Sequence, residues 1–154
     1  MHPFVHAASH PDRIATIMAG SGATMTYGEL EARSNQVAHL LRANGLKRGD
    51  TVVVFMENCL EYLAICWGAQ RAGLVYVAMA TKLTAEEAGY IVSDSGASVI
   101  FAGASLAAVA ANLPVVTARY ALGGSIAGYE PYETAVAAQP TSRIDDESCG
   151  RDML

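Results

Sequence analysis

The sequence predicts an α/β fold, in which a parallel sheet carries helices on its faces. Short apolar runs rich in β-branched residues alternate along the chain with longer segments of helical periodicity. Glycines stand where several helical segments end, and Thr-x-x-Glu pairs stand where two of them begin. Strands that are joined through helices run parallel, because the right-handed crossover packs each helix back onto the sheet.

The first helix is predicted at residues 26–45. Thr26 and Glu29 have the spacing of a capping box, and Gly45 is placed to end the helix. One face carries the apolar side chains of Leu30, Val37 and Leu41. Residues 51–55 follow as a continuous β-branched run, which predicts a central strand covered on both faces.

A second helix is predicted at residues 58–72. Asn58 and Glu61 repeat the capping spacing, and the segment is apolar almost all round, so we expect it to be largely buried. Residues 74–78 form the next predicted strand. Residues 84–94 form a third helix, opened by Thr84 with Glu87.

The alternation continues with a strand at residues 98–101 and an alanine-rich helix at 105–112. Beyond Pro114, residues 115–117 are predicted to form a fourth strand. Residues 122–128 are rich in glycine and predict a loop. Each strand is thus followed by a helix or a turn.

The predicted organisation has three parts: an N-terminal arm with a hairpin at 1–24, an α/β subdomain at 25–138, and a loop at 139–154. The subdomain closes on a short helix at 131–138, with proline in its first turn. Residues 139–151 contain hardly an apolar side chain, which favours irregular structure.

Composition excludes several classes of function. The chain has 154 residues and a formal net charge of −5, with no block of Lys or Arg, so we expect no nucleic-acid partner. No apolar run reaches the roughly 18 residues of a membrane helix. The three cysteines lack Cys-x-x-Cys spacing, which favours reduced thiols. A cytoplasmic location is therefore the expectation.

No catalytic or metal-binding residue is predicted from the motifs. Gly20-Ser21-Gly22 lacks the lysine and helix of a phosphate cradle and favours a hairpin turn. The acidic run at 145–147 favours a solvated loop over a cation site. The four histidines are not accompanied by other potential metal ligands: His2, His6, His10 and His39.

Five segments, in order, resemble the adenylate-forming enzymes, and within them the fatty-acyl and aryl acyl-CoA synthetases. They are Thr26-Tyr27-Gly28-Glu29-Leu30 and residues 46–52, 57–62, 68–73 and 83–95. The resemblance implies an enzyme that activates a carboxylic acid with ATP and Mg²⁺ to an acyl-adenylate, releases pyrophosphate, and transfers the acyl group to coenzyme A (CoA). The fold it implies is the opening part of the family's large N-terminal domain.

The resemblance extends over residues 10–154, about the opening third of a family member. It implies that the phosphate-binding loop follows residue 154, so the chain alone is expected to be inactive and to bind neither ATP, Mg²⁺ nor CoA tightly. Where the family often has Pro-x-Asn, this chain has Met79-Ala80-Thr81-Lys82. This stretch lies near the CoA tunnel in relatives, which implies that Lys82, with Thr81, contacts a CoA phosphate. The alternative is an exposed, solubilising lysine.

Two other functions stay open at this point. A free-standing binding or assembly module would keep the scaffold without catalysis, and a small flavodoxin-like domain fits the strand–helix rhythm but lacks a ligand loop. A sheet without its later strands would expose an apolar edge and face, so self-association into a homodimer is expected.

Overall fold

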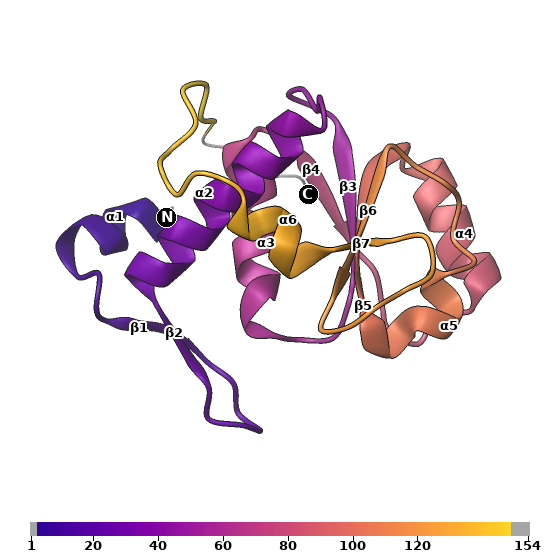
Figure 1. Cartoon of the computed structure of the whole chain (residues 1–154), viewed down its shortest axis with the longest axis horizontal. Helices are drawn as coiled ribbons and strands as arrows, with labels where there is room; N and C mark the ends of the chain where they lie inside the picture. Colours follow the sequence, from indigo (N-terminus) through magenta and orange to yellow (C-terminus); the bar gives the residue numbers. More distant parts are fainter. Residues whose placement is uncertain (1–2, 149–154) are drawn as a thin grey trace.

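A five-stranded parallel sheet runs through the computed structural model, which describes residues 3–148 (Figure 1). The strand order is β4-β3-β5-β6-β7, and every neighbouring pair is parallel. The fold class is therefore α/β, as predicted. The strands are β3 (Thr51–Phe55), β4 (Val75–Ala78), β5 (Ala97–Gly103), β6 (Ala118–Leu122) and β7 (Glu130–Pro131).

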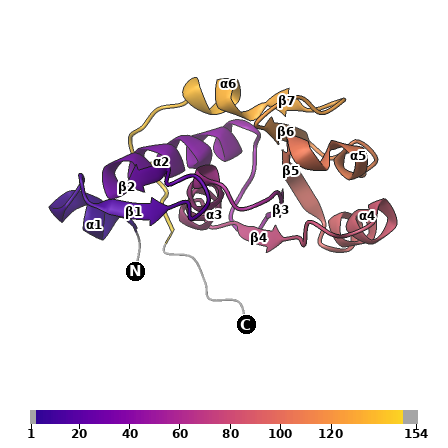
Figure 2. The same cartoon turned by 90° about the horizontal axis from the view of Figure 1, so that it is seen from below.

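Helices cover both faces of the sheet (Figures 1 and 2). On one face pack α2 (Tyr27–Ala43), α3 (Leu60–Arg71) and α6 (Tyr132–Ala137). On the other pack α4 (Ala85–Asp94) and α5 (Ala107–Ala110), the latter preceded by a short 3₁₀ turn at Ala104–Leu106. No helix within residues 3–148 combines the length and apolar character needed to cross a bilayer.

Strand β3 shows how the core divides between the two faces. Val52 and Val54 pack on the side of α2 and α3, whereas Val53 and Phe55 pack on the side of α4 and α5. All four are fully buried. A strand covered on both faces needs apolar side chains at successive positions, which is why its sequence is a continuous apolar run. The predicted central strand is confirmed.

A short helix and a hairpin precede this core. The helix α1 (Pro3–Ser9) was not predicted, and the antiparallel hairpin of β1 (Ile14–Ile17) and β2 (Thr24–Thr26) projects beside α2 (Figure 1). The Gly22 amide donates to the Met18 carbonyl over 2.8 Å, and Gly22 has a φ of 70°. The predicted hairpin turn at the glycines is confirmed, since a left-handed residue is needed to close it.

Two helix starts follow the predicted capping chemistry and one does not. Thr26 with Glu29, and Thr84 with Glu87, form complete capping boxes. The cap predicted at Asn58 is wrong: α3 begins one residue later, with Cys59 at its cap and no side-chain hydrogen bond there. Ile65 and Ala69 pack onto the sheet from this helix, and that packing outweighs a single cap bond.

The expectation that α3 is largely buried is confirmed, since Leu63 is the only one of its twelve residues that is exposed. Its buried residues lie on the side toward α2 and the sheet, while Leu63 on the outer side is 40% exposed. A short apolar helix can be read as buried from composition alone, but only the packing of the neighbouring helices decides which sides are covered.

The predicted fourth strand at 115–117 is wrong. Val115 is 81% exposed, and the strand is β6, whose residues from Ala118 pair with β5 from Val99 onward. The helix predicted at 105–112 is confined to the 3₁₀ turn and α5, and the two-residue strand β7 was not predicted. Pairing with β5 sets the register of β6, and the local sequence pattern does not show which residues will pair.

The loop after α6 is more tightly bound than its composition suggests. The acidic run at 145–147 was expected to be solvated, yet the Glu147 side chain is only 13% exposed and forms ion pairs with Arg71 and Arg143. The expectation is wrong for this residue, because the buried Arg71 guanidinium attracts a carboxylate to it. The rest of the predicted 139–154 loop, from residue 149, lies outside the described residues.

Candidate functional site at the carboxyl edge of the sheet

Open parallel sheets bind ligands at the carboxyl ends of their strands, beside the point where the strand order reverses. Here the chain passes from β3 to β4 on one side and then crosses to β5 on the other side of β3. The reversal therefore lies between β3 and β5. The loops at this edge begin at Met56, Met79, Ala104 and Gly123.

The crevice between β3 and β5 is filled by the protein itself. Met56 is 4% exposed, and its Cβ lies 3.2 Å from the position that a Cβ on Gly103 would occupy. Glycine at 103 thus allows the loop after β3 to approach β5 closely. The ends of the two strands therefore lie close together at this point.

The glycine pair at the end of β6 does not form a phosphate cradle. Gly123 and Gly124 have φ values of 69° and 153°, so the chain turns sharply there. The Gly123 amide, however, donates to the Glu133 carboxylate over 2.8 Å. A phosphate site needs free amides that face an anion, and here a carboxylate of the chain already takes that place. The Gly123 amide is therefore not free to bind a phosphate of ATP.

The same edge supplies no ligand set for Mg²⁺. Within residues 3–148 the structure shows no group of three or more His, Cys, Asp or Glu side chains placed to hold a metal ion. Of the histidines, His6 packs against Tyr27 with ring centroids 4.8 Å apart and the rings tilted by 34°, and His39 donates to the Ser142 carbonyl over 2.9 Å. No step that needs the metal can be assigned to these side chains.

Thr81 and Lys82 lie at the carboxyl edge, in the turn between β4 and α4. The Leu83 amide donates to the Ala80 carbonyl over 3.3 Å and closes this turn. Thr81 is half-buried and Lys82 is exposed, and the structure shows no ion pair for Lys82 with another described residue. The ammonium group is therefore accessible to an anion from solution, although Thr84 and Glu87 beside it are committed to capping α4.

The thiols near this edge are poor nucleophiles. Burial raises the pKa of Cys59, at the cap of α3, and raises the pKa of Cys66 in the same helix to about 12. Only the thiolate attacks or binds a metal, so burial disfavours the reactive form of both groups. Both cysteines are free of disulfide bonds.

One polar cluster was missed by sequence reasoning. Arg71 is fully buried and donates to both carboxylate oxygens of Glu31, over 3.0 and 2.6 Å, and to the Asn35 side-chain oxygen. Two signals could have found it: an arginine at the end of a largely apolar helix, and Glu31 with Asn35 four residues apart on one helix face. The cluster joins α2 to α3 and lies among residues of the core.

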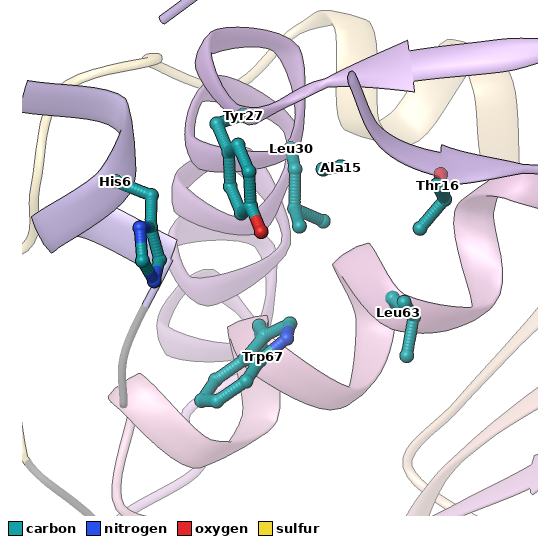
Figure 3. A pocket seen from close by; sticks show the side chains of 7 residues that line it. All are labelled: His6, Ala15, Thr16, Tyr27, Leu30, Leu63 and Trp67. Carbon is teal, nitrogen blue, oxygen red and sulfur yellow. The ribbon is translucent and has the colours of Figure 1, made fainter. Parts of the chain in front are cut away.

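A pocket of about 200 Å³ lies between the hairpin, α1, α2 and α3. The rings of His6, Tyr27 and Trp67 gather around it, with Leu63 on the opposite wall (Figure 3). Its lining residues come from α1, β1, α2 and α3, and none of them belongs to the five-stranded sheet. It is therefore a separate feature from the carboxyl edge, with largely apolar walls.

Known proteins share this architecture. The N-terminal domain of FACL13 from Mycobacterium tuberculosis is 26% identical and has a TM-score of 0.76; the match covers 93% of this chain and 36% of that one. A benzoate CoA ligase from Burkholderia xenovorans, 22% identical over 96% of this chain and 30% of its own, has the same fold with a TM-score of 0.79. The fold is thus that of the N-terminal domain of adenylate-forming enzymes.

The family model described as AMP-binding enzyme matches residues 4–149, and the chain belongs to this family. A long-chain-fatty-acid–CoA ligase of Mycobacterium tuberculosis is 36% identical over 67% of this chain and 20% of its own length. The long-chain fatty acid transport protein 1 of Bos taurus is 37% identical over 67% of this chain and 16% of its own length. The chain therefore spans about a fifth of the curated relatives that it matches.

Proposed function

We propose that this chain is the opening layer of an acyl-CoA ligase that activates a fatty acid. In that reaction the acid's carboxylate attacks the α-phosphorus of ATP, an acyl-adenylate forms, and pyrophosphate leaves. The thiol of CoA then attacks the acyl carbon and displaces AMP. The observation that carries the proposal is the family match along residues 4–149, together with relatives that are named as fatty-acid ligases.

The contribution of these residues to the reaction is structural. The Gly123 amide is taken by Glu133, the described residues hold no group of three or more side chains placed for a metal ion, and the two described cysteines are buried or half-buried with raised pKa values. The chain supplies a rigid sheet with both faces covered, from which the loops of a longer enzyme can be positioned. The chain alone is accordingly proposed to be inactive and to bind ATP, Mg²⁺ and CoA weakly.

A fatty acid is favoured over an aryl acid as the substrate. The relatives above at 36 and 37% identity are named for long-chain fatty acids. A 3-hydroxybenzoate–CoA ligase of Aromatoleum sp. is 34% identical over a shorter stretch, 58% of this chain and 17% of its own length, so an aryl acid is the alternative substrate to test. The thiol acceptor is proposed to be CoA. One relative, of Streptomyces coeruleorubidus, is named as a fatty acid–acyl-carrier-protein ligase. It is 33% identical over 81% of this chain and 24% of its own length, so a carrier-protein thiol is the alternative acceptor to test.

At the edge of the sheet, Lys82 is proposed to contact a phosphate of CoA, with Thr81 beside it. The support is its exposure in the turn after β4, at the edge where such folds bind ligands. The reduced thiols Cys59 and Cys66 favour a cytoplasmic location, where ATP and CoA are available. Self-association through exposed apolar side chains such as Ile17 and Tyr76 also stays a proposal.

The experiment compares this chain with the same chain followed by the remainder of a ligase, each incubated with ATP, Mg²⁺ and a fatty or aryl acid. Pyrophosphate release measures adenylation, and thioester formation is measured with CoA or a carrier protein. The longer protein should activate fatty acids and require CoA, and the chain alone should release none. If the longer protein activates no acid, the proposal of a ligase is contradicted, and a non-catalytic binding module becomes the better explanation.

A further inference from the structure

Residues 139–148, here named the strap, cross α2 and α3 as an irregular segment with a turn at 145–146. Four side chains of α2 reach it from one helix face, because they are spaced one, four and seven residues from the first: Asn35, Gln36, His39 and Arg42. Three of them donate to strap carbonyls, at 2.8, 3.1 and 2.9 Å, and Arg42 donates to Asp146 over 2.8 Å. The strap thus satisfies the donors of a whole helix face.

The C-terminal end of the strap is attached to α3. The Ser148 amide donates to the Arg71 carbonyl over 2.7 Å, and Glu147 lies 3.7 Å from the Arg71 guanidinium. Arg71 is fully buried and its Nε has no hydrogen-bond partner in the structure. Burying a charged guanidinium without a partner costs free energy. The contacts of the Arg71 Nη1 and Nη2 atoms with Glu31 and Glu147 therefore contribute more to stability than an exposed ion pair would.

Apolar contact contributes little to this attachment. Ile144 is the only strap residue of the buried apolar core among residues 139–148, and it is 6% exposed. The remaining ties are hydrogen bonds, ion pairs and one cation–π contact, in which the Arg143 guanidinium lies 4.2 Å from the centre of the Phe4 ring in α1. Segments with few buried apolar contacts open with a smaller free energy than the core to which they are attached.

We propose that the strap opens from α2 and α3 as a unit, and that the ion pair of Arg71 with Glu147 is the latch that keeps its C-terminal end closed. Opening would free the donors of α2 and the Arg71 guanidinium and would release the chain that follows residue 148. In a longer protein of this family, the latch would then fix where that chain leaves the α2–α3 layer. The proposal stands on these contacts alone and does not depend on the proposed enzyme activity.

Native-state proteolysis tests the latch. Thermolysin cleaves before bulky apolar residues, and the bond between Arg143 and Ile144 becomes accessible to it only when Ile144 leaves the core. Glu147→Gln removes the ion pairs of Glu147 with both Arg71 and Arg143, so it is compared with Arg143→Gln, which leaves the pair with Arg71 and should raise cleavage less. Asp145→Asn is a matched control, in which an exposed carboxylate without an ion pair among the described residues is neutralised. A further variant, Asp146→Asn, weakens the ion pair between Asp146 and Arg42. The Asp146 side chain is 66% exposed.

Glu147→Gln should raise the cleavage rate at this bond roughly tenfold, Asp146→Asn by less, and Asp145→Asn by less than about twofold. Exchange of the Ser148 amide should accelerate with the first variant, while the urea midpoint of the sheet stays within error. Equal rates for Glu147→Gln and Asp145→Asn would overturn the proposal. It would also be overturned if cleavage within β3 and β5 rose in step with that of the strap, or if Asp146→Asn had the larger effect.

Discussion

Gly68 of α3 faces Val37 of α2 so closely that a Cβ on Gly68 would lie 2.5 Å from the Val37 Cβ and 2.9 Å from the Ser34 carbonyl oxygen. Atoms cannot stand at these separations, so the two helices can approach each other to this distance only with glycine at 68. The contact holds α2, which carries the strap ties, against α3, which carries Arg71.

Gly68→Ala should therefore destabilise the fold by about 1–3 kcal/mol, although alanine favours a helix over glycine by about 1 kcal/mol. The matched control is Gly89→Ala in α4, where the nearest atom to the new Cβ is a Pro114 carbon at 3.8 Å; there the free energy of unfolding should rise by up to about 1 kcal/mol. Urea denaturation measures both. Equal effects of the two variants would show that the close approach is not limiting, and Val37→Ala added to Gly68→Ala should recover part of the loss.

The buried pair of Arg71 with Glu31 gives a prediction about stability. Arg71→Met leaves a carboxylate that is 15% exposed without its partner, so the free energy of unfolding should fall by about 3–5 kcal/mol. The double variant Arg71→Met with Glu31→Met should be less destabilised than Arg71→Met alone, since no charge is left unpaired at Glu31. A loss below about 1 kcal/mol for the single variant would contradict the assigned importance of this pair.

The capping boxes give a pH dependence. Hydrogen bonds from the backbone and side chain of Thr26 lower the pKa of Glu29, and those of Thr84 lower the pKa of Glu87. A carboxylate whose pKa is lower in the folded state adds stability that is complete above its ordinary pKa of 4.5 and is lost as the pH falls through the folded value. Stability should therefore decline as the pH is lowered from about 5.

The decline is measured by urea denaturation at a series of pH values. Glu87→Gln should make the free energy of unfolding depend less steeply on pH below 4.5, the ordinary pKa of this group. The neighbouring Glu86→Gln, which removes a charge outside the capping box, is the control and should leave the slope as it is. If both variants flatten the curve alike, the effect belongs to the helix dipole in general.

The Cys66 thiol should be unreactive in the folded protein. With its pKa raised from 9.0 to about 12 by burial, its thiolate fraction at pH 8 is lower by about a thousandfold than that of an unfolded chain. The measurement is labelling by an aromatic disulfide reagent in a Cys149→Ser background, with Cys59→Ser added to isolate the site. Labelling at a rate close to that in denaturant would show that the helix opens locally or that the thiol is accessible.

Lys82 should affect the binding of CoA and not the adenylation of the acid. In a ligase that contains this chain, Lys82→Ala should raise the KM for CoA several-fold, because one cation–phosphate contact is removed, and should leave pyrophosphate release with the fatty acid unchanged. Lys47→Ala, in the turn before β3, is a control for surface charge. A Lys82→Ala variant with an unaltered KM for CoA would leave Lys82 as a solubilising residue.

Much of this fold could be predicted because its signals are local. The run of apolar residues in β3, the capping boxes at Thr26 and Thr84, and the glycine turn of the hairpin each depend on residues within one segment. The ordered resemblance of five segments then indicated the family. These features need no knowledge of what lies across the fold.

The features that were missed or misplaced depend on distant partners. The strand at β6 was placed at Val115 because pairing with β5, and not hydrophobicity, selects which residues join the sheet. The expectation of a solvated Glu147 failed because its partner Arg71 lies 76 residues earlier in the chain. Local pattern carries no information about a charge that arrives from another element.

The amino-acid order by itself thus determined the α/β class, the ends of several elements and the family, because propensity, capping and periodicity act between residues a few positions apart. Only the tertiary structure decided that Gly68 meets Val37, that Met56 fills the crevice between β3 and β5, and that Arg71 is buried beneath the strap. Each of these depends on how closely two remote segments pack, and that distance is set by all the side chains between them at once.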